Sequence, residues 1–317
     1  MDSRPLGLST LNVSVVGLGC NNFGRPASAS ESKEGTRAVV DAAIEAGVTF
    51  FDTADIYGAE YGLSETRIGE VLGRKRDRIV LATKFGHTEV PSPIPGHKGS
   101  RAYIRAAVEG SLTRLKTDHI DLYQQHTPDP NVPIEDTLGA LDELVREGKV
   151  VAIGNSNFDA EQLAEADAQA ERLGTARFVS AQNEYNLLAR GVEADILPAS
   201  RALGLGFLPF FPLANGLFTG KFTRTERPAD SRIARLRPHL ADDAPWDAIE
   251  AYDAFCRDHG VSMLEATFGW LISRPGLTSV IAGATTAQQV MQNASAGSGW
   301  RPTPAEAEII EGLFPLN

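Results

Sequence analysis

Four side chains that can move protons or carry charge stand at the ends of three successive apolar runs. Asp52 and Tyr57 belong to FFDTADIYG, Lys84 ends VLATK, and His126 follows DLYQQ. Such a group suits proton delivery to a carbonyl oxygen. A phenol, with an ordinary pKa near about 10, is a weak acid at neutral pH. A neighbouring ammonium stabilises the phenolate and lowers that pKa.

In this hypothesis Tyr57 is the general acid and Lys84 tunes it. Asp52 keeps Lys84 charged and oriented. His126 fixes the substrate oxygen with a hydrogen bond or shares the proton with Tyr57. Taken singly, Asp52 is more typical of a turn cap, and Tyr57 and His126 of structural residues. Lys84 follows the apolar run 79–82 with only Thr83 between, and it must bury its charge or find a partner, so the joint occurrence favours catalysis.

The elements that must position these residues follow a regular pattern. Eight short apolar or β-branched runs each precede a stretch with helical periodicity. The predicted strands span residues 13–18, 49–52, 79–83, 120–125, 150–155, 179–182, 206–210 and 279–282. Units of this kind imply parallel strands joined by right-handed crossovers. Eight units without a linker favour a single (β/α)8 TIM barrel, an α/β fold, over residues 1–317.

Three further segments complete this prediction. Residues 4–13 are expected to form a short N-terminal hairpin that plugs the barrel floor. Two long loops follow the third and seventh strands, at residues 86–99 and 211–243. Both lie at the C-terminal strand ends, where barrels keep their chemistry. The second, third and fourth strands are neighbours in a barrel, so the four candidate residues should converge over one sector of this rim.

Composition limits the partners that we expect. The chain has 42% hydrophobic residues, which is enough for a large core, and a formal net charge of −11. Such a charge provides no general field for nucleic acid or an anionic membrane. The N-terminal segment lacks the pattern of a signal peptide, and prolines interrupt the apolar stretch 204–218. We therefore expect a cytoplasmic protein that acts on a small molecule and binds neither nucleic acid nor membrane.

Motifs of other enzyme classes are incomplete. Gly17 and Gly19 begin a dinucleotide-binding fingerprint, but Asn22 replaces its third glycine. The segment 216–221 is one residue short of a phosphate-binding loop, and Phe222 replaces the hydroxyl that would hold magnesium. No tyrosine has a lysine four residues later, and the histidines lack metal-ligand spacing, so we expect no metal.

The segments FFDTADIYG, ATKFG and IDLYQQH closely resemble signature motifs of the aldo-keto reductase superfamily, and the resemblance covers nearly the whole chain. The spacing of Asp52, Tyr57, Lys84 and His126 matches the catalytic tetrad of that family. The resemblance implies a (β/α)8 barrel that binds NADPH or NADH in an extended form without a Rossmann domain. Hydride would reach a carbonyl carbon while Tyr57 protonates the oxygen.

The resemblance also assigns cofactor contacts. In GNSNF and AQNEYN, the residues Ser156, Asn157 and Gln182 would hydrogen-bond the carboxamide. Phe210 would stack on the nicotinamide, where relatives usually have tyrosine. The pyrophosphate side would be formed by Leu213, Gly216, Leu217 and Lys221. The adenosine side would be formed by Gly283, Thr285, Gln289 and Asn293, where loop amides and a helix N-terminus suit an anion.

The preference between NADPH and NADH depends on a cation for the 2′-phosphate. Many NADPH-selective relatives carry Lys or Arg in the last motif, where this chain has Gly283 and Gln289. Residues 221–237 contain six cations against two acids. Arg232, in a stretch similar to a Ser-Arg pair of relatives, is the best candidate. We therefore expect NADPH, with NADH as the alternative.

Three activities remain compatible with these residues. The leading hypothesis is reduction of an aldehyde or ketone to an alcohol, with Phe23, Phe85 and residues 86–99 as walls of the substrate pocket. The same site run backwards would oxidise a sugar hemiacetal or a secondary alcohol. A protein of another class, a cofactor-sensing regulatory subunit that resembles potassium-channel β subunits, would also keep this fold.

Overall fold

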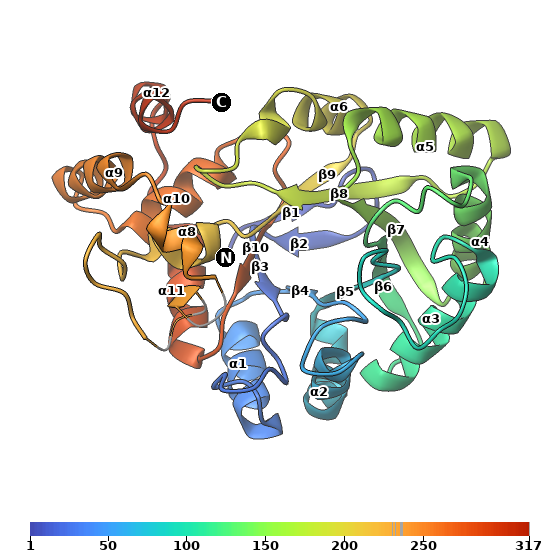
Figure 1. Ribbon diagram of the computed structural model, residues 1–317. Coiled ribbons are helices and arrows are strands. Elements are labelled where there is room, and N and C mark those ends of the chain that lie inside the picture. Colours follow the sequence, from blue (N-terminus) through green and yellow to red (C-terminus); the bar gives the residue numbers. More distant parts are fainter. Residues whose placement is uncertain (230, 232, 235–236, 317) are drawn as a thin grey trace.

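A computed structural model describes residues 1–229, 231, 233–234 and 237–316. In this part of the chain, eight parallel strands form one sheet, surrounded by helices (Figure 1). The strands are β3 (Val16–Gly19), β4 (Phe50–Asp52), β5 (Val80–Phe85), β6 (Ile120–Gln125), β7 (Val150–Ser156), β8 (Phe178–Glu184), β9 (Gly206–Phe210) and β10 (Val280–Gly283). The predicted strands are all found.

The order of the strands makes the sheet a barrel. Neighbours run β10-β3-β4-β5-β6-β7-β8-β9, and an isolated parallel bridge between Phe207 and Leu277 links β9 to the segment before β10. The predicted (β/α)8 barrel is therefore confirmed. The largest boundary difference is at the first strand, where the apolar run 13–18 is divided between two elements. The backbone N–H of Val15 donates to Asp2, and its carbonyl accepts from Val280, so the chain passes from the hairpin to the barrel at this residue.

Helices follow the strands and cover the outside of the barrel. They are α1 (Lys33–Glu45), α2 (Leu63–Leu72), α3 (Arg101–Leu115), α4 (Ile134–Arg146), α5 (Ala160–Leu173), α6 (Ile196–Ala202), α8 (His239–Asp242), α9 (Trp246–Asp258), α10 (Met263–Ile272), α11 (Ala287–Ser298) and α12 (Pro304–Leu313). Short 3₁₀ helices span Gly73–Arg78, Gly191–Glu193 and Ala214–Thr219. None of the described helices has both the length and the apolar character needed to cross a membrane.

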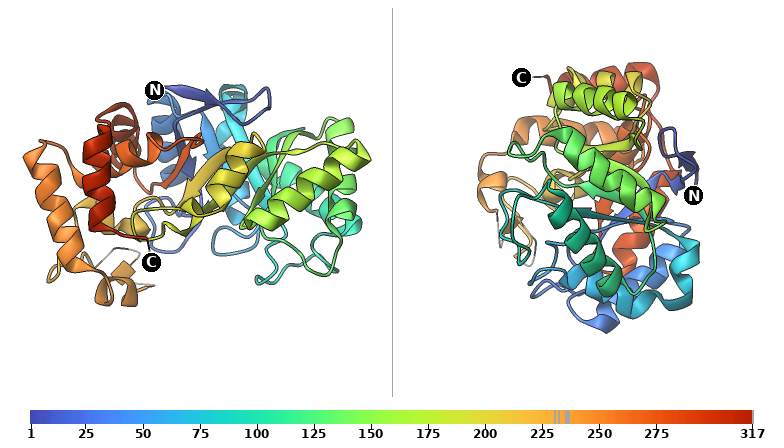
Figure 2. Two further views of the ribbon diagram at one scale, coloured as in Figure 1. Left: turned by 90° about the horizontal axis from the view of Figure 1, so that it is seen from above. Right: turned by 90° about the vertical axis from the view of Figure 1, so that its right-hand side faces the viewer.

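An antiparallel hairpin, β1 (Ser3–Pro5) and β2 (Asn12–Ser14), lies at one end of the barrel (Figure 2). Leu6 and Val13 of this segment are buried in one cluster with inward-facing residues of the strands, among them Phe50, Ala82 and Leu122. The hairpin therefore plugs the floor as predicted, and the interior is a packed core rather than a pore.

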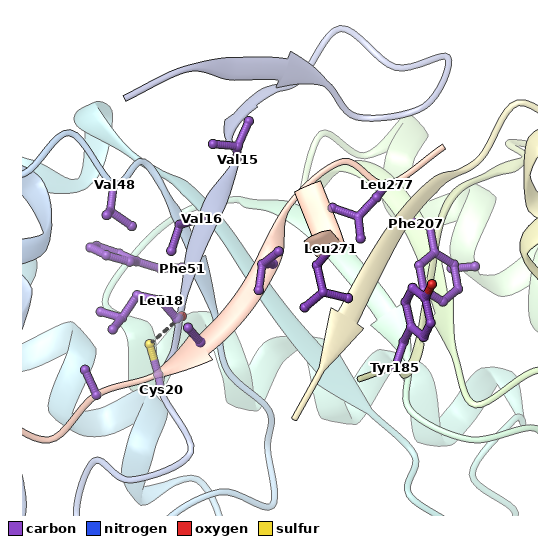
Figure 3. Packing of buried hydrophobic residues seen from close by; sticks show 14 of the residues in the cluster. Val15, Val16, Leu18, Cys20, Val48, Phe51, Tyr185, Phe207, Leu271 and Leu277 are labelled. Carbon is purple, nitrogen blue, oxygen red and sulfur yellow. Dashed lines mark hydrogen bonds between the residues drawn. The ribbon is translucent and has the colours of Figure 1, made fainter. Parts of the chain in front are cut away.

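The opposite faces of the strands pack against the helices. Between the strands and the helices lies a second apolar cluster, larger than the one inside the barrel. It includes Val16 and Leu18 of β3 and Phe51 of β4 (Figure 3). The buried Cys20 thiol lies just past β3 and donates a weak hydrogen bond to the carbonyl of Leu18 at 3.4 Å. Because most strand residues are buried on both faces, the strands appear in the sequence as continuous apolar runs.

Candidate active site

The inward-facing positions of the barrel change from apolar to polar toward its C-terminal end. Side chains two residues apart on a strand share a face. Two positions beyond the apolar plug, that face carries Asp52 on β4, Lys84 on β5 and Gln124 on β6. All three are buried, as is Gln182 on β8. A polar layer therefore lies directly on an apolar one.

An ion pair stands at the centre of this layer. The Lys84 Nζ lies 2.6 Å from Asp52 Oδ2 and donates to the carbonyl of Thr53 at 2.9 Å. The second carboxylate oxygen of Asp52 accepts from the amides of Gln124 at 3.1 Å and Gln182 at 3.0 Å. Lys84 has no exposed surface, so the pair is shielded from solvent and its charges are fully compensated.

Tyr57 and His126 complete the group at the rim. The Lys84 Nζ lies 3.4 Å from the Tyr57 hydroxyl and 5.0 Å from the centre of its ring. The rings of Tyr57 and His126 meet edge to face, with their centres 5.8 Å apart. The structure therefore brings together the four residues on which the sequence argument rests.

Burial and charge act in opposite directions on these groups. Burial raises the pKa of Tyr57, and the attraction of the Lys84 ammonium offsets only part of that rise. Lys84 acts in the expected direction, but burial outweighs it. Burial alone would lower the pKa of Lys84, yet Asp52 and Tyr57 raise it, so the ammonium stays protonated.

The His126 imidazole is neutral in this environment. Burial, and then the positive charge of Lys84, hold its pKa well below the ordinary value. A neutral imidazole carries one N–H and can donate one hydrogen bond. The lowered pKa of His126 is therefore compatible with a hydrogen-bond donor, the first of the two roles considered for this residue.

The three residues assigned to the carboxamide lie beside the tetrad. The Ser156 hydroxyl donates to the carbonyl of Gln182 at 2.9 Å. The Asn157 side-chain amide donates to the carbonyl of His126 at 2.9 Å and to Ser156 Oγ at 3.1 Å. Asn157 has φ +62°, a left-handed conformation that asparagine tolerates better than most residues.

Most of the other assigned cofactor residues line one cavity of about 530 Å³, between the β3–α1 loop, the segment after β9 and α11. These are Leu213, Gly216, Lys221, Gly283, Thr285, Gln289 and Asn293. Phe210 ends β9, and its ring meets that of the cavity residue Phe211 at 5.2 Å. Leu217 is buried in the core and does not line the cavity. Arg232 lies outside the described residues.

The backbone beside this cavity is strained. Phe211, Ala214 and Asn215 all have φ between +46° and +59°. Left-handed conformations at such residues cost about 1–3 kcal/mol each and concentrate at functional sites. Phe211 and Asn215 line the cavity, so the strain lies where a ligand would contact the chain.

Several residues of the site were not singled out from the sequence. Gln124, which bonds Asp52, could have been found by alternation, since it lies two positions before His126 on an inward-facing strand. Asn22, Arg25 and Gln292 line the smaller cavity. The Arg25 guanidinium donates a hydrogen bond to the side-chain oxygen of Asn21 at 2.5 Å. In the sequence, only its place after the first barrel strand indicates that Arg25 lies at the rim.

A larger cavity of about 910 Å³ is lined by Gln125 and Thr127, the neighbours of His126 in the chain, but by none of the four tetrad residues. It is lined in part by His87, whose ring centre is 4.8 Å from that of His126. Phe23 and Phe85, which we expected as walls of the substrate pocket, have no exposed surface and line neither cavity. Phe85 follows the inward-facing Lys84, so it faces the helices, where it stacks on Tyr123 at 4.8 Å.

Comparisons with known proteins show to which family the chain is similar. The model of the aldo/keto reductase family matches residues 15–313. An uncharacterized oxidoreductase of Bacillus subtilis is 37% identical over 92% of this chain and 89% of the relative. A probable voltage-gated potassium channel subunit beta of rice is 34% identical over 93% of this chain and 91% of the relative. The L-glyceraldehyde 3-phosphate reductase of Escherichia coli K12 is 32% identical over 93% of this chain and 87% of the relative. The chain therefore belongs to the aldo/keto reductase family.

Proposed function

We propose that this protein reduces an aldehyde or ketone group of a small molecule to an alcohol, with NADPH as the cofactor. The observation that carries the proposal is the placement of the Tyr57 hydroxyl 3.4 Å from the buried Lys84 ammonium, at the rim of the barrel. A phenol beside a fixed positive charge can release its proton to a substrate oxygen.

The residues of the smaller cavity fit a dinucleotide. Arg25 and Lys221 bring positive charge to it, and the N-terminus of α11 opens onto it at Thr285 and Thr286. The side-chain oxygen of Asn215 is buried there without a partner among the described residues, and a ribose hydroxyl could satisfy it. The bound nicotinamide would supply the hydride.

The tetrad supplies the proton. Tyr57 donates from its hydroxyl to the carbonyl oxygen, and Lys84 stabilises the phenolate that remains. Asp52 balances the charge of Lys84 inside the barrel. The neutral His126, whose ring contacts that of Tyr57, donates a hydrogen bond to the carbonyl oxygen of the substrate. This bond orients the oxygen toward the Tyr57 hydroxyl. Proton transfer from a group positioned in this way contributes about 10²- to 10⁴-fold to a rate.

The direction of the reaction is tested by comparing two assays. We expect sustained NADPH consumption with simple aldehydes to exceed NADP⁺ or NAD⁺ reduction with sugars and secondary alcohols at neutral pH. Faster oxidation of the sugars would instead assign the protein as a dehydrogenase that uses the same residues.

The cofactor preference is tested by two substitutions in the segment after β9. A charge-assisted hydrogen bond contributes about 1.5–3 kcal/mol, so Arg232→Ala should weaken NADPH binding roughly 10- to 100-fold and leave NADH binding unchanged. Lys221→Met is the matched control, because a pyrophosphate contact is common to both cofactors and its loss should weaken both alike. Fluorescence titration measures these affinities. Tighter binding of NADH by the wild type would contradict the choice of NADPH.

A second candidate function follows from one comparison. Relatives from rice and Arabidopsis thaliana, at 34% and 33% identity, are named probable voltage-gated potassium channel subunit beta. A regulatory subunit would use bound cofactor as a sensor. Single-turnover oxidation followed by very slow cofactor release would favour this function, whereas rapid multiple turnover would favour the enzyme.

A further inference from the structure

Asp55 is a buried residue that stands between Asp52 and Tyr57 in the sequence. Its carboxyl group has no part in the proposed proton transfer. Its backbone N–H donates to the carbonyl of Lys84 at 3.0 Å. Its carbonyl accepts from the N–H of Gly62 at 2.6 Å, which closes the turn that carries Tyr57. The backbone of Asp55 therefore ties this turn to β5.

The side chain of Asp55 is only partly satisfied. Its Oδ2 accepts from the Tyr61 hydroxyl at 2.6 Å, whereas its Oδ1 has no partner among the described residues. Burial raises the pKa of this carboxyl to about 7. An asparagine could make the same hydrogen bond at a lower cost of burial, so folding alone does not explain the charge.

The groups around Asp55 decide where its charge acts. The titratable side chains that influence it, or that it influences, are Tyr61 from the same turn, Glu65 from α2, Tyr103 and Arg114 from α3, Tyr123 from β6, and Lys98 from residues 86–99. The carboxylate of Glu65 pairs with Arg114 at 2.7 Å, so these two charges compensate each other. Arg114 still lowers the pKa of Asp55 more than Lys98 does, and Lys98 is the cation of this group that belongs to residues 86–99.

Lys98 belongs to the loop that follows β5 and spans residues 86–99, called the 86–99 loop below. Its Nζ donates to the backbone carbonyls of His87 and Val90, so it fastens the loop internally. These acceptors are neutral, and the charge of Lys98 is attracted by Asp55 and by Asp129. The charge of an ionised Asp55 therefore acts on the 86–99 loop through Lys98.

A second connection runs through hydroxyl groups. The Tyr61 hydroxyl donates to Asp55, and Ser92 of the 86–99 loop acts to lower the pKa of this hydroxyl. The Ser92 hydroxyl also accepts from Tyr103 at 2.8 Å. At the start of the same loop, His87, Thr88 and Glu89 line the larger cavity. That cavity lies next to His126.

We propose that Asp55 is a positioning residue whose ionised carboxylate holds the 86–99 loop in the conformation that binds substrate. This inference rests on the proposed function, because it assigns the substrate to the larger cavity beside the tetrad. Protonation of Asp55 removes its attraction for Lys98 and releases the loop. Among the described residues, the side chain of Asp55 forms no hydrogen bond with Asp52 or Lys84 and does not line the smaller cavity, so we expect the chemical step and cofactor binding to stay unchanged.

The expected pH dependence follows from the sign of this titration. Asp55 is ionised above pH of about 7 and neutral below it. If only the ionised form binds substrate, the apparent KM scales inversely with the ionised fraction, and it rises about tenfold between pH 8 and pH 6. The kcat and the cofactor Kd should not follow this titration.

The experiment measures KM and kcat for an aldehyde from pH 5.5 to 8.5 in wild type, Asp55→Asn and Tyr61→Phe. Asp55→Asn should have a high KM at every pH. Tyr61→Phe should keep the transition but move it to higher pH, because the Tyr61 hydroxyl lowers the pKa of Asp55. Glu60→Gln is the matched control: it neutralises an exposed carboxylate of the same turn and should behave as wild type. A wild-type KM profile in Asp55→Asn, or a loss confined to kcat, would overturn the proposal.

A readout without substrate separates this inference from the proposed function. Amide hydrogen-exchange protection of residues 86–99 should fall between pH 8 and pH 6 in wild type and stay low at both values in Asp55→Asn. Equal protection in both proteins would overturn the role of Asp55. A pH-dependent loop in a protein that reduces no carbonyl compound would contradict the proposed function while the role of Asp55 in ordering the loop stands.

Discussion

Tyr57→Phe should lower kcat for carbonyl reduction by about 10²- to 10⁴-fold and leave the cofactor Kd unchanged. The substitution removes the only atom of the side chain that carries a transferable proton. The ring remains, so its edge-to-face contact with His126 and its place above the Lys84 ammonium are kept. Steady-state NADPH consumption and a fluorescence titration of NADPH measure the two quantities.

The control for this variant is Tyr252→Phe. Tyr252 of α9 is buried, and its hydroxyl lies 3.1 Å from that of Thr267. The helix α9 lies away from β4, β5 and β6, which carry the tetrad (Figure 1). Loss of the Tyr252 hydroxyl should lower the free energy of unfolding by about 1 kcal/mol and leave kcat unchanged. If Tyr57→Phe reduced aldehydes at the wild-type rate, the proton would have to come from another group, and the role given to Tyr57 would be wrong.

The barrel could be predicted from the sequence because of how its strands are buried. Each strand is covered by the helices on one face and by the interior on the other, so it appears as a short apolar run without alternation. Two predicted strands, 120–125 and 206–210, agree with β6 and β9 at both ends. Lys84 was conspicuous for the same reason: a charge at the end of such a run requires a partner, and the structure supplies Asp52.

The walls of the site were harder to predict, because they depend on which face of a strand each residue takes and on how the rim loops pack. Phe85 could have been excluded as a substrate contact, since it alternates with Lys84 and must face the helices. Phe23 lies in a loop, where no periodicity reveals its burial in the core. Likewise, His87 and Arg25 reach the cavities through the packing of loops after the strands, which the local sequence does not encode.

Lys84→Met should both unfold more readily and lose carbonyl reduction. Methionine has a similar volume, but it leaves the Asp52 carboxylate buried without a cation. Breaking a buried ion pair in this way costs about 3–5 kcal/mol, because the remaining charge loses its compensation. Urea denaturation gives the free energy of unfolding. The rate should fall at least about 10²-fold, since the phenolate of Tyr57 is no longer stabilised.

The double variant Asp52→Asn, Lys84→Met separates these two effects. Asparagine removes the uncompensated charge and keeps an oxygen that can accept from Gln124 and Gln182, so most of the lost stability should return. Activity should not return, because the ammonium that lies 3.4 Å from the Tyr57 hydroxyl is still missing. If the double variant were as unstable as Lys84→Met, the loss would come from packing at residue 84 rather than from charge. If it regained activity, Lys84 would not be the group that makes Tyr57 an acid.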